Sequence, residues 1–475
     1  MGGSREWGKR LRRARPQARA VIEWNDKAAP VQLNEEAAPV QPVQKGKDNM
    51  KSITTGDIMH AMGSFGLQMD YTVRMKLRLT DEVDGAILAE AVAKTQRRFP
   101  YLSLRMCRNE QEFYYEQNSA PVVLFHTDKA IQLNSEQSNY HVWAVCYWED
   151  YLYLDIYHGL CDGTGMYMVL TTLLYYYCNE RYGVTDSEGV RVLTDQVAPG
   201  ESDDPADHMP RLDPALLKRP ARPEVFSLTA DAGMTPSEPL VYDIEMPEEA
   251  FMRFSSAYDA SPGTMVSILF ARAIDALFPG RTKPLTNSYI INARPMIGAP
   301  LTHHNCVQTV FFEYSDRVKA LPFDRQCTVH RGTTFVQAMP ERVAGQLTFS
   351  ANINSMAAQM APTAEAKKQA FAQMLGGGRR YFTYMVSYVG KWKAVQLAPY
   401  VREFWTHVPN ANELLTEISA INGKIFLSVH QNFREDDVVR AFLQQLEEHD
   451  VPYKVSGPMG NDIAGFGEPS ENREA

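Results

Sequence analysis

The first half of the sequence contains short runs of aromatic and β-branched residues, and this pattern predicts β-strands. Two of these runs, Val142–Trp148 and Tyr151–Tyr157, are separated only by Glu149 and Asp150, which is the pattern of a β-hairpin. The chain continues from the second run directly into a glycine-rich segment. The other strands predicted in this half are Thr72–Leu79, Leu104–Cys107 and Glu112–Glu116.

Apolar residues at helical spacing lie between these strands. An amphipathic pattern predicts a helix over Asp84–Phe99, which Pro100 ends because proline cannot continue a helix. Two more helices are predicted, one over Thr54–Phe65 and one with apolar residues over Met166–Tyr177 and Thr164 as its N-cap.

The second half mixes the same two patterns. Helices interleaved with strands in both halves predict an α/β protein of two layered lobes. The strands expected here are Ser288–Ala293, Cys306–Tyr314, Arg380–Tyr388, Glu403–Val408, Leu415–Ile421 and Lys424–His430. The helices expected here are Pro247–Tyr258, Met265–Phe278, Thr334–Leu347, Ala364–Met374 and Glu435–His449.

Local composition divides the chain into five parts. Residues 1–50 have an arginine-rich start and a repeated Ala-Pro-Val-Gln, which predicts a disordered extension. Residues 185–239 are rich in Asp, Pro and Ser and are predicted to form a linker that crosses between the lobes. We therefore expect an N-terminal lobe at 51–184, a C-terminal lobe at 240–456 and a flexible tail at 457–475.

Charge and cysteine content exclude several classes of function. The formal net charge of -9 argues against a general nucleic-acid-binding protein, which needs a basic surface. The six cysteines are scattered without a Cys-x-x-Cys pair, which favours a reducing cytoplasm over a disulfide framework or zinc site. No apolar run reaches the roughly 18 residues of a membrane-spanning helix.

The candidate chemistry lies directly after the second strand of the hairpin. His158 is followed by Gly159-Leu160-Cys161 and then by Asp162-Gly163. A neutral imidazole accepts and returns a proton near neutral pH, so a histidine at a strand end is a candidate general base. Asp162 stands at a predicted helix start, where a carboxylate bonds backbone amides or an arginine from elsewhere and shapes the loop.

His158-x-x-x-Asp162-Gly163 resembles the active-site signature of the coenzyme A-dependent acyltransferase superfamily. That superfamily includes chloramphenicol acetyltransferase, alcohol acetyltransferases, polyketide-associated acyltransferases and the condensation domains of peptide synthetases. The resemblance implies a two-lobed sandwich of mixed β-sheets with helices and an active-site tunnel between the lobes. It also implies His158 as the general base, Asp162 as a structural residue and Gly163 as support for the site.

The same resemblance extends to two residues of the second half. Asn292-Ala293-Arg294-Pro295 resembles an Arg-Pro motif of condensation-type relatives, and we expect Arg294 to pair with Asp162 across the lobes. Ser387, in Ser387-Tyr388-Val389-Gly390, resembles a channel-lining segment and is a candidate donor to an oxyanion. Each has an ordinary alternative, a surface arginine at a turn and a serine bonded to its own backbone.

The predicted function is transfer of an acyl group from acyl-CoA, as co-substrate, to a hydroxyl or amine of a small molecule. No permanently bound cofactor or metal is expected, and the predicted state is a monomer. Two alternatives stay open: a stand-alone condensation enzyme that uses an acyl carrier protein, and a non-catalytic relative. Tyr157 stands where condensation domains usually carry a second histidine, which favours the acyltransferase.

Two other side-chain groups have simpler explanations. Cys161 is expected to fill the loop as a small apolar residue and not to act as a nucleophile. His303 and His304 are neighbours on a chain predicted to be extended, so they are expected to face opposite ways and not to bind a metal.

Overall fold

The structure is a computed structural model that describes residues 50–54, 57, 71–208, 224–348, 361–376, 381–409, 413–461, 463, 470 and 471. Contacts divide the chain between Asp48 and Asn49, and residues 49–475 form one compact unit. The predicted N-terminal extension lies outside the described residues except for Met50, which begins the first strand. Most of the predicted helix Thr54–Phe65 also lies outside them.

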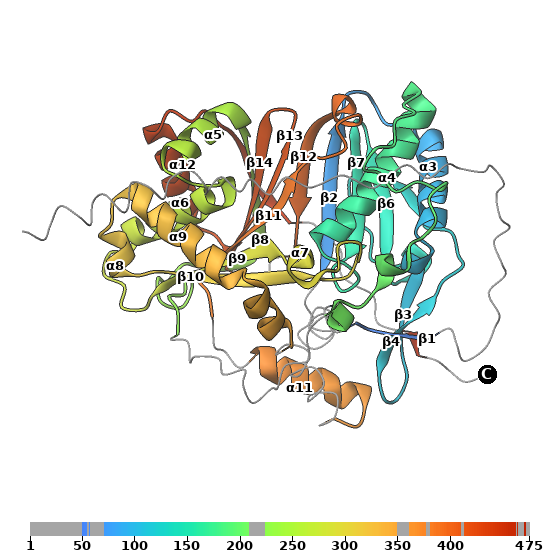
Figure 1. Ribbon diagram of the computed structural model, residues 1–475, viewed down its shortest axis with the longest axis horizontal. Coiled ribbons are helices and arrows are strands. Elements are labelled where there is room, and N and C mark those ends of the chain that lie inside the picture. The colour runs from blue at the N-terminus through green and yellow to red at the C-terminus, as the bar shows by residue number, and fades with distance from the viewer. Residues whose placement is uncertain are drawn as a thin grey trace, which may run out of the picture. The chain divides into compact units, whose positions relative to one another are not determined.

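The first lobe is built on a five-stranded sheet with the order β12-β2-β7-β6-β5 (Figure 1). The predicted hairpin is confirmed as β6 and β7, and the predicted strand beside it is confirmed as β2. Thr72 pairs with Tyr157, so the first residue of β2 lies beside the last residue of β7. The strands are β2 (Thr72–Leu79), β5 (Leu124–His126), β6 (Trp143–Trp148), β7 (Tyr151–Tyr157) and β12 (Val401–His407).

Strand β12 corrects the predicted division between the lobes. Its residues were expected in the C-terminal lobe, but β12 pairs antiparallel with β2. The aromatic side chains of Phe404 and Trp405 explain this placement, because both are buried in the core of the first lobe. Burial of two large rings is a stronger determinant of position than closeness in the sequence.

A second, four-stranded sheet joins the first lobe to the C-terminus. Its order is β1-β4-β3-β16, and β16 pairs parallel with β3. The predicted strand pair of this region is confirmed as the β3–β4 hairpin. The strands are β1 (Met50–Ser52), β3 (Leu104–Arg108), β4 (Phe113–Gln117) and β16 (Ser470–Glu471).

The second lobe is built on a seven-stranded sheet with the order β10-β9-β11-β13-β14-β8-β15. Strand β11 runs parallel to both of its neighbours, and the other pairs are antiparallel, so the sheet is mixed as expected. The strands are β8 (Pro236–Pro247), β9 (Leu285–Asn292), β10 (Val307–Tyr314), β11 (Tyr384–Lys391), β13 (Leu414–Ile421), β14 (Lys424–Phe433) and β15 (Lys454–Gly460).

The ends of this sheet differ from the sequence-based expectation. Strand β8 begins at Pro236, inside the predicted linker, and residues 457–460 of the predicted flexible tail belong to β15. β15 pairs with β8 and so provides hydrogen-bond partners for backbone N–H and C=O groups of β8 that would lack them at a sheet edge. Residues 470 and 471 of the same predicted tail form β16.

Figure 1 shows α5, α6 and α12 beside the seven-stranded sheet, and α3 and α4 beside the five-stranded sheet. Among the described residues, no helix is both long and apolar enough to cross a bilayer. The longer helices are α3 (Gly85–Arg98), α4 (Gly163–Tyr182), α5 (Glu248–Ala257), α6 (Pro262–Leu277), α9 (Phe323–Gln337), α11 (Ala364–Gly376) and α12 (Asp437–Glu448). The short ones are α7 (Arg294–Ile297) and α8 (Asp316–Lys319).

Two helix predictions need correction. Asp162, not Thr164, caps α4, because its carboxylate accepts a hydrogen bond from the Gly165 amide at 3.1 Å. The single helix predicted over Thr334–Leu347 is divided in two: α9 begins at Phe323 and ends at Gln337, and a separate helical stretch follows at 340–348. Pro340 opens that second stretch, where its missing N–H costs nothing.

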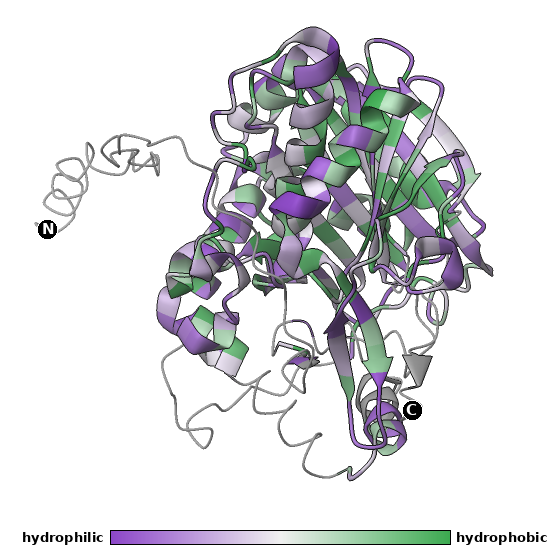
Figure 2. Cartoon of the chain, turned by 90° about the vertical axis from the view of Figure 1, so that its right-hand side faces the viewer, coloured by the Kyte–Doolittle hydropathy of each residue, from purple (hydrophilic) through white to green (hydrophobic). Residues whose placement is uncertain are grey.

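Each lobe has its own hydrophobic core, and Figure 2 shows hydrophobic residues running along the strands. Alternate residues of β13 serve the two cores, since Leu415 and Ile421 join the core of the first lobe while Ile418 joins that of the second. The face of the seven-stranded sheet that carries Leu415 and Ile421 is called the inner face below. It faces the first lobe, and the opposite face packs against α5, α6 and α12.

Candidate active site

His158 lies in the turn between β7 and α4, and its backbone is fixed by contacts from several elements. Its amide donates to the carbonyl oxygen of Tyr71 at 2.6 Å, just before β2. Its carbonyl oxygen accepts from Asn305 Nδ2 at 2.6 Å. The next carbonyl, that of Gly159, accepts from the Tyr115 hydroxyl at 2.8 Å. His158 keeps some accessible surface while Tyr157 and Leu160 have none, so this residue is the exposed point of a buried loop.

Burial lowers the pKa of the His158 imidazole below its ordinary value. A hydrogen bond between the ring and the residue's own backbone opposes this effect, as do the charges of Asp162 and Asp57 and a contact with Asn305. Because burial dominates, the ring is neutral at neutral pH. A neutral imidazole is the form that can take a proton.

The predicted pairing of Arg294 with Asp162 is confirmed. Arg294 Nη1 donates to Asp162 Oδ2 and Nη2 donates to Oδ1, both at 2.8 Å, and each side chain is only 2% exposed. Burial by itself would raise the pKa of the Asp162 carboxyl, but Arg294 and the amides of Cys306 and Gly165 bring it below its usual value. The pair therefore stays charged and joins the start of α4 to the segment after β9.

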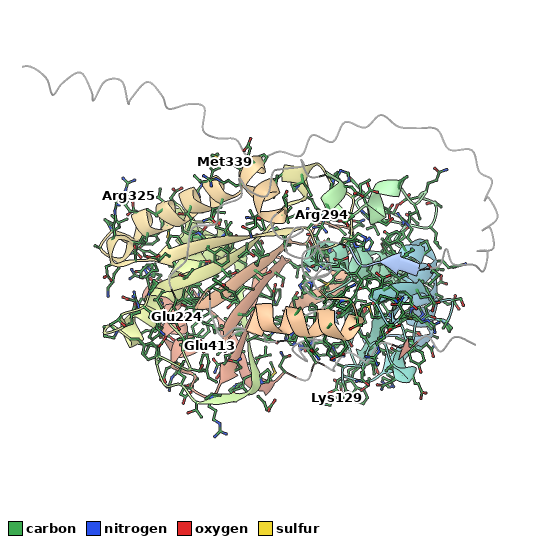
Figure 3. The ribbon with its side chains drawn as sticks, turned by 90° about the horizontal axis from the view of Figure 1, so that it is seen from below. Lys129, Glu224, Arg294, Arg325, Met339 and Glu413 are labelled. Atoms are coloured by element: carbon green, nitrogen blue, oxygen red, sulfur yellow. The ribbon has the colours of Figure 1, made fainter. Side chains whose placement is uncertain are left out.

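Arg294 uses its whole guanidinium group in this place. Besides the two bonds to Asp162, its Nε donates to the Thr302 carbonyl at 2.9 Å. Nη2 donates to the His304 carbonyl at 2.8 Å, and Nη1 to Asn292 Oδ1 at 3.2 Å. All five N–H donors of the side chain thus have a partner, which a lysine could not reproduce. Figure 3 labels Arg294 at the junction of the two lobes.

A second buried group, which the sequence did not predict, supports the His158 loop. The Asp57 carboxylate, fully buried, accepts from the Asn305 amide at 2.9 Å and from Asn305 Nδ2 at 2.7 Å. His304 Nδ1 lies 2.6 Å from the other oxygen of Asp57. Asn305 Nδ2 thereby bridges Asp57 and the His158 carbonyl. The only signal in the sequence was the pair His303-His304, and nothing local indicated a partner 247 positions away.

The two adjacent histidines do not face opposite ways as expected. Their ring centroids lie 3.9 Å apart, because the segment after α7 is irregular and not an extended strand. Burial would lower the pKa of His304, but Asp57 raises it, whereas burial lowers the pKa of His303 well below its usual value. His303 Nδ1 contacts the Glu201 carbonyl at 2.7 Å. Within the described part of the chain no three His, Cys, Asp or Glu side chains are grouped to hold a metal ion.

The remaining candidates have plainer surroundings. Burial raises the pKa of the Cys161 thiol well above its usual value, which suits a small apolar side chain and not a nucleophile. Gly163 begins α4 directly after its cap. Ser387 lies on β11 opposite Glu417 of β13, and its hydroxyl opposes the effect of burial on the Glu417 pKa. Burial raises the pKa of Glu417 to about 7, a feature that the sequence analysis missed.

Comparison with known proteins identifies the fold. No protein-family model and no curated protein matches the sequence. Among solved structures, TRI101 from F. sporotrichioides, complexed with coenzyme A and T-2, superimposes with a TM-score of 0.56 at 11% identity and covers 86% of this chain and 100% of its own.

Two further solved structures have the same architecture. The first condensation domain of the calcium-dependent antibiotic synthetase gives 0.58 at 15% identity, with coverage of 85% and 99%. Polyketide synthase associated protein 5 from Mycobacterium tuberculosis gives 0.53 at 11%, with coverage of 83% and 96%. The predicted two-lobed α/β fold is confirmed.

Proposed function

We propose that this chain, which has the fold of the coenzyme A-dependent acyltransferase and condensation-domain superfamily, is an acyltransferase with His158 as its general base. The donor is an acyl-CoA, and the acceptor is a small molecule with a hydroxyl or amine. One observation carries the proposal: the His158 loop is held by residues of both lobes, its imidazole is neutral because burial lowers its pKa, and the residue as a whole keeps accessible surface. A similar fold with coenzyme A bound, TRI101, supports the choice of donor.

The reaction needs only one proton carrier. His158 takes the proton from the acceptor hydroxyl or amine, and the acceptor heteroatom attacks the thioester carbonyl. The carbon–sulfur bond breaks as the new ester or amide forms, and the imidazolium returns the proton to the departing thiolate. No covalent acyl-enzyme is formed, and holding both substrates in one place supplies much of the rate.

Asp162 acts through the backbone and not as a partner of the imidazole. Its carboxylate is fully occupied by Arg294, the Gly165 amide and the Cys306 amide. It thus fixes the start of α4 four residues after His158, with Gly163 as the first residue of that helix. The role of Ser387 as a donor to the oxyanion stays a prediction, because its position in the sheet is opposite Glu417.

The test of this function is thiol release from acyl-CoA. Purified protein, incubated with acetyl-, butyryl- and octanoyl-CoA and a panel of small alcohols and amines, is expected to release free coenzyme A only when an acceptor is present. Mass spectrometry should then find an ester or amide product. Release only from a donor loaded on an acyl carrier protein would favour the condensation-type alternative, which the similarity to a condensation domain supports. No transfer from either donor would overturn the proposal.

Asn305→Ala is expected to lower kcat by roughly tenfold to a hundredfold with little change in the KM for acyl-CoA. The variant removes the two hydrogen bonds of Nδ2, to Asp57 and to the His158 carbonyl, so the orientation of the imidazole is no longer fixed. Steady-state kinetics, with acyl-CoA and acceptor varied in turn, measure the changes in kcat and KM separately. Asn179→Ala, which removes one similar bond at the far end of α4, is the control. Equal kcat values for the two variants would contradict this positioning role.

A further inference from the structure

A row of polar side chains crosses the inner face of the seven-stranded sheet. In the register of the sheet, Ser387 lies opposite Glu417, Glu417 opposite Ser428 and Ser428 opposite Asp243. Residues directly opposite each other point to the same side of a sheet. The face is the inner one, because Leu415, two residues before Glu417, packs into the core of the first lobe. A row of polar groups in the interior requires partners for each member.

Two members of the row have such partners. Asp243 accepts from the Ser428 hydroxyl at 2.9 Å and lies 3.1 Å from His407 Nε2 of β12. Burial would raise the pKa of the Asp243 carboxyl, but His407 brings it below its usual value. This end of the row is therefore a satisfied structural group between the lobes.

Glu417 lies in the same row as Asp243, but among the described residues it has no cationic partner such as His407. Ser387 lies opposite it in the sheet and opposes the effect of burial on its pKa, and no cationic side chain among the described residues offsets that burial. The raised pKa of its carboxyl follows from that burial. A native protein that keeps a buried carboxyl without a counter-charge departs from the general rule, and such departures are frequent at ligand sites.

Accessible surface decreases along this face toward Glu417. Thr309, Ile290 and Ser387 keep intermediate exposure, Glu417 retains 9%, and Ser428 has 1%. Phe311 and Met385, one position along the same face, are also partly exposed. The part of the inner face over β10, β9 and β11 is thus incompletely covered, and Glu417 marks the inner limit of the uncovered part.

The same face leads to the His158 loop. Asn292, at the end of β9, is two residues from Ile290, and its side chain bonds Arg294, the partner of Asp162. Ile290 pairs with Ser387, so Glu417 lies two strands across from Ile290. With strands about 4.8 Å apart and a rise of about 3.3 Å per residue, Glu417 is roughly 12 Å from Asn292. One small molecule of that length can extend from Glu417 to the segment beside the His158 loop.

We infer that Glu417, together with Ser387, binds the acyl acceptor through a second hydrogen-bond-donating group, a hydroxyl or a protonated amine, remote from the atom that His158 deprotonates. The inference rests on the proposed function and specifies its substrate class: acceptors with two polar ends separated by an apolar segment. A protonated amine suits the site best, because it supplies the counter-charge that the described residues do not. Ser387, directly opposite Glu417 in the sheet, adds a second polar group to the site.

The experiment compares acceptors of one length that differ only at the remote end. With acetyl-CoA as donor, 1-aminooctane, 8-amino-1-octanol and 1,8-diaminooctane present no group, a hydroxyl and an ammonium to Glu417. For the wild-type protein we expect the KM of the two bifunctional acceptors to be at least tenfold below that of 1-aminooctane. Glu417→Gln should raise the KM of the diamine at least tenfold while the KM for acetyl-CoA stays unchanged.

Two further variants make the outcome decisive. Glu249→Gln removes the same charge from an exposed position on α5 and should leave all three KM values unchanged. Ser387→Ala should raise the KM of the diamine about threefold to tenfold, and it decides the question if Glu417→Gln does not fold. Wild-type transfer with a diamine KM that neither variant changes would overturn this inference alone. Wild-type protein that transfers no acyl group from any of the three acyl-CoA donors or from a carrier-loaded donor would overturn the proposed function with it.

Discussion

Replacing His158 with alanine is expected to lower kcat roughly a thousandfold, because proton removal from the acceptor has no other carrier in the proposed mechanism. The loop itself should survive the change. Its fixed points are the backbone groups of residue 158, which bond Tyr71 and Asn305, and the carbonyl of Gly159, which bonds Tyr115. Thermal unfolding of the variant should therefore match that of the wild-type protein while coenzyme A release is almost lost.

The pH dependence gives an independent check on the same residue. Burial lowers the pKa of His158 below its ordinary value of about 6.5, so most of the rings are still neutral at pH 6.5. The wild-type kcat/KM should therefore fall only at more acidic pH. His126→Ala, at an exposed site on β5, is the control and should keep both the rate and the profile. An active His158→Ala protein would contradict the base assignment, and an inactive wild-type protein would favour the non-catalytic alternative.

Features that depend on neighbouring residues were predictable from the sequence. Strand β2 has the predicted bounds, and the β6–β7 hairpin was recognisable because two aromatic runs flank a two-residue turn. The pairing of Asp162 with Arg294 was predictable only through a resemblance, since 132 positions separate the two residues and each has an ordinary alternative.

Features that depend on contacts between distant segments were not predictable in the same way. The position of β12 in the first sheet and the contact of Asp57 with His304 and Asn305 follow from how the lobes pack, which no local pattern encodes. Glu417 did leave a signal, because it is the one charged residue of the strand-like run Leu414–Ile421, which predicts a buried charge. Its significance depends on the absence of a nearby cation among the described residues, which only the structure shows.

Arg294→Ala is expected to lower the free energy of unfolding by about 3 to 5 kcal/mol, because it leaves the Asp162 carboxylate buried without its counter-charge. The loss should be greatest at neutral pH. The folded-state pKa of Asp162 is below its unfolded value of about 3.9, so the pair stabilises the protein above that value and its contribution disappears as the pH falls through the folded pKa. Urea unfolding at pH 7 and at pH values well below about 3.9 measures both effects.

A charge-removing double variant separates the ion pair from simple loss of packing. Asp162→Asn combined with Arg294→Gln leaves no isolated buried charge, so its stability should exceed that of Arg294→Ala and the two single effects should not add. Arg325→Ala is the control, since that arginine is 67% exposed and its removal should change stability by less than about 0.5 kcal/mol. Stability of Arg294→Ala equal to that of Arg325→Ala would mean that the contact between the lobes does not depend on this pair.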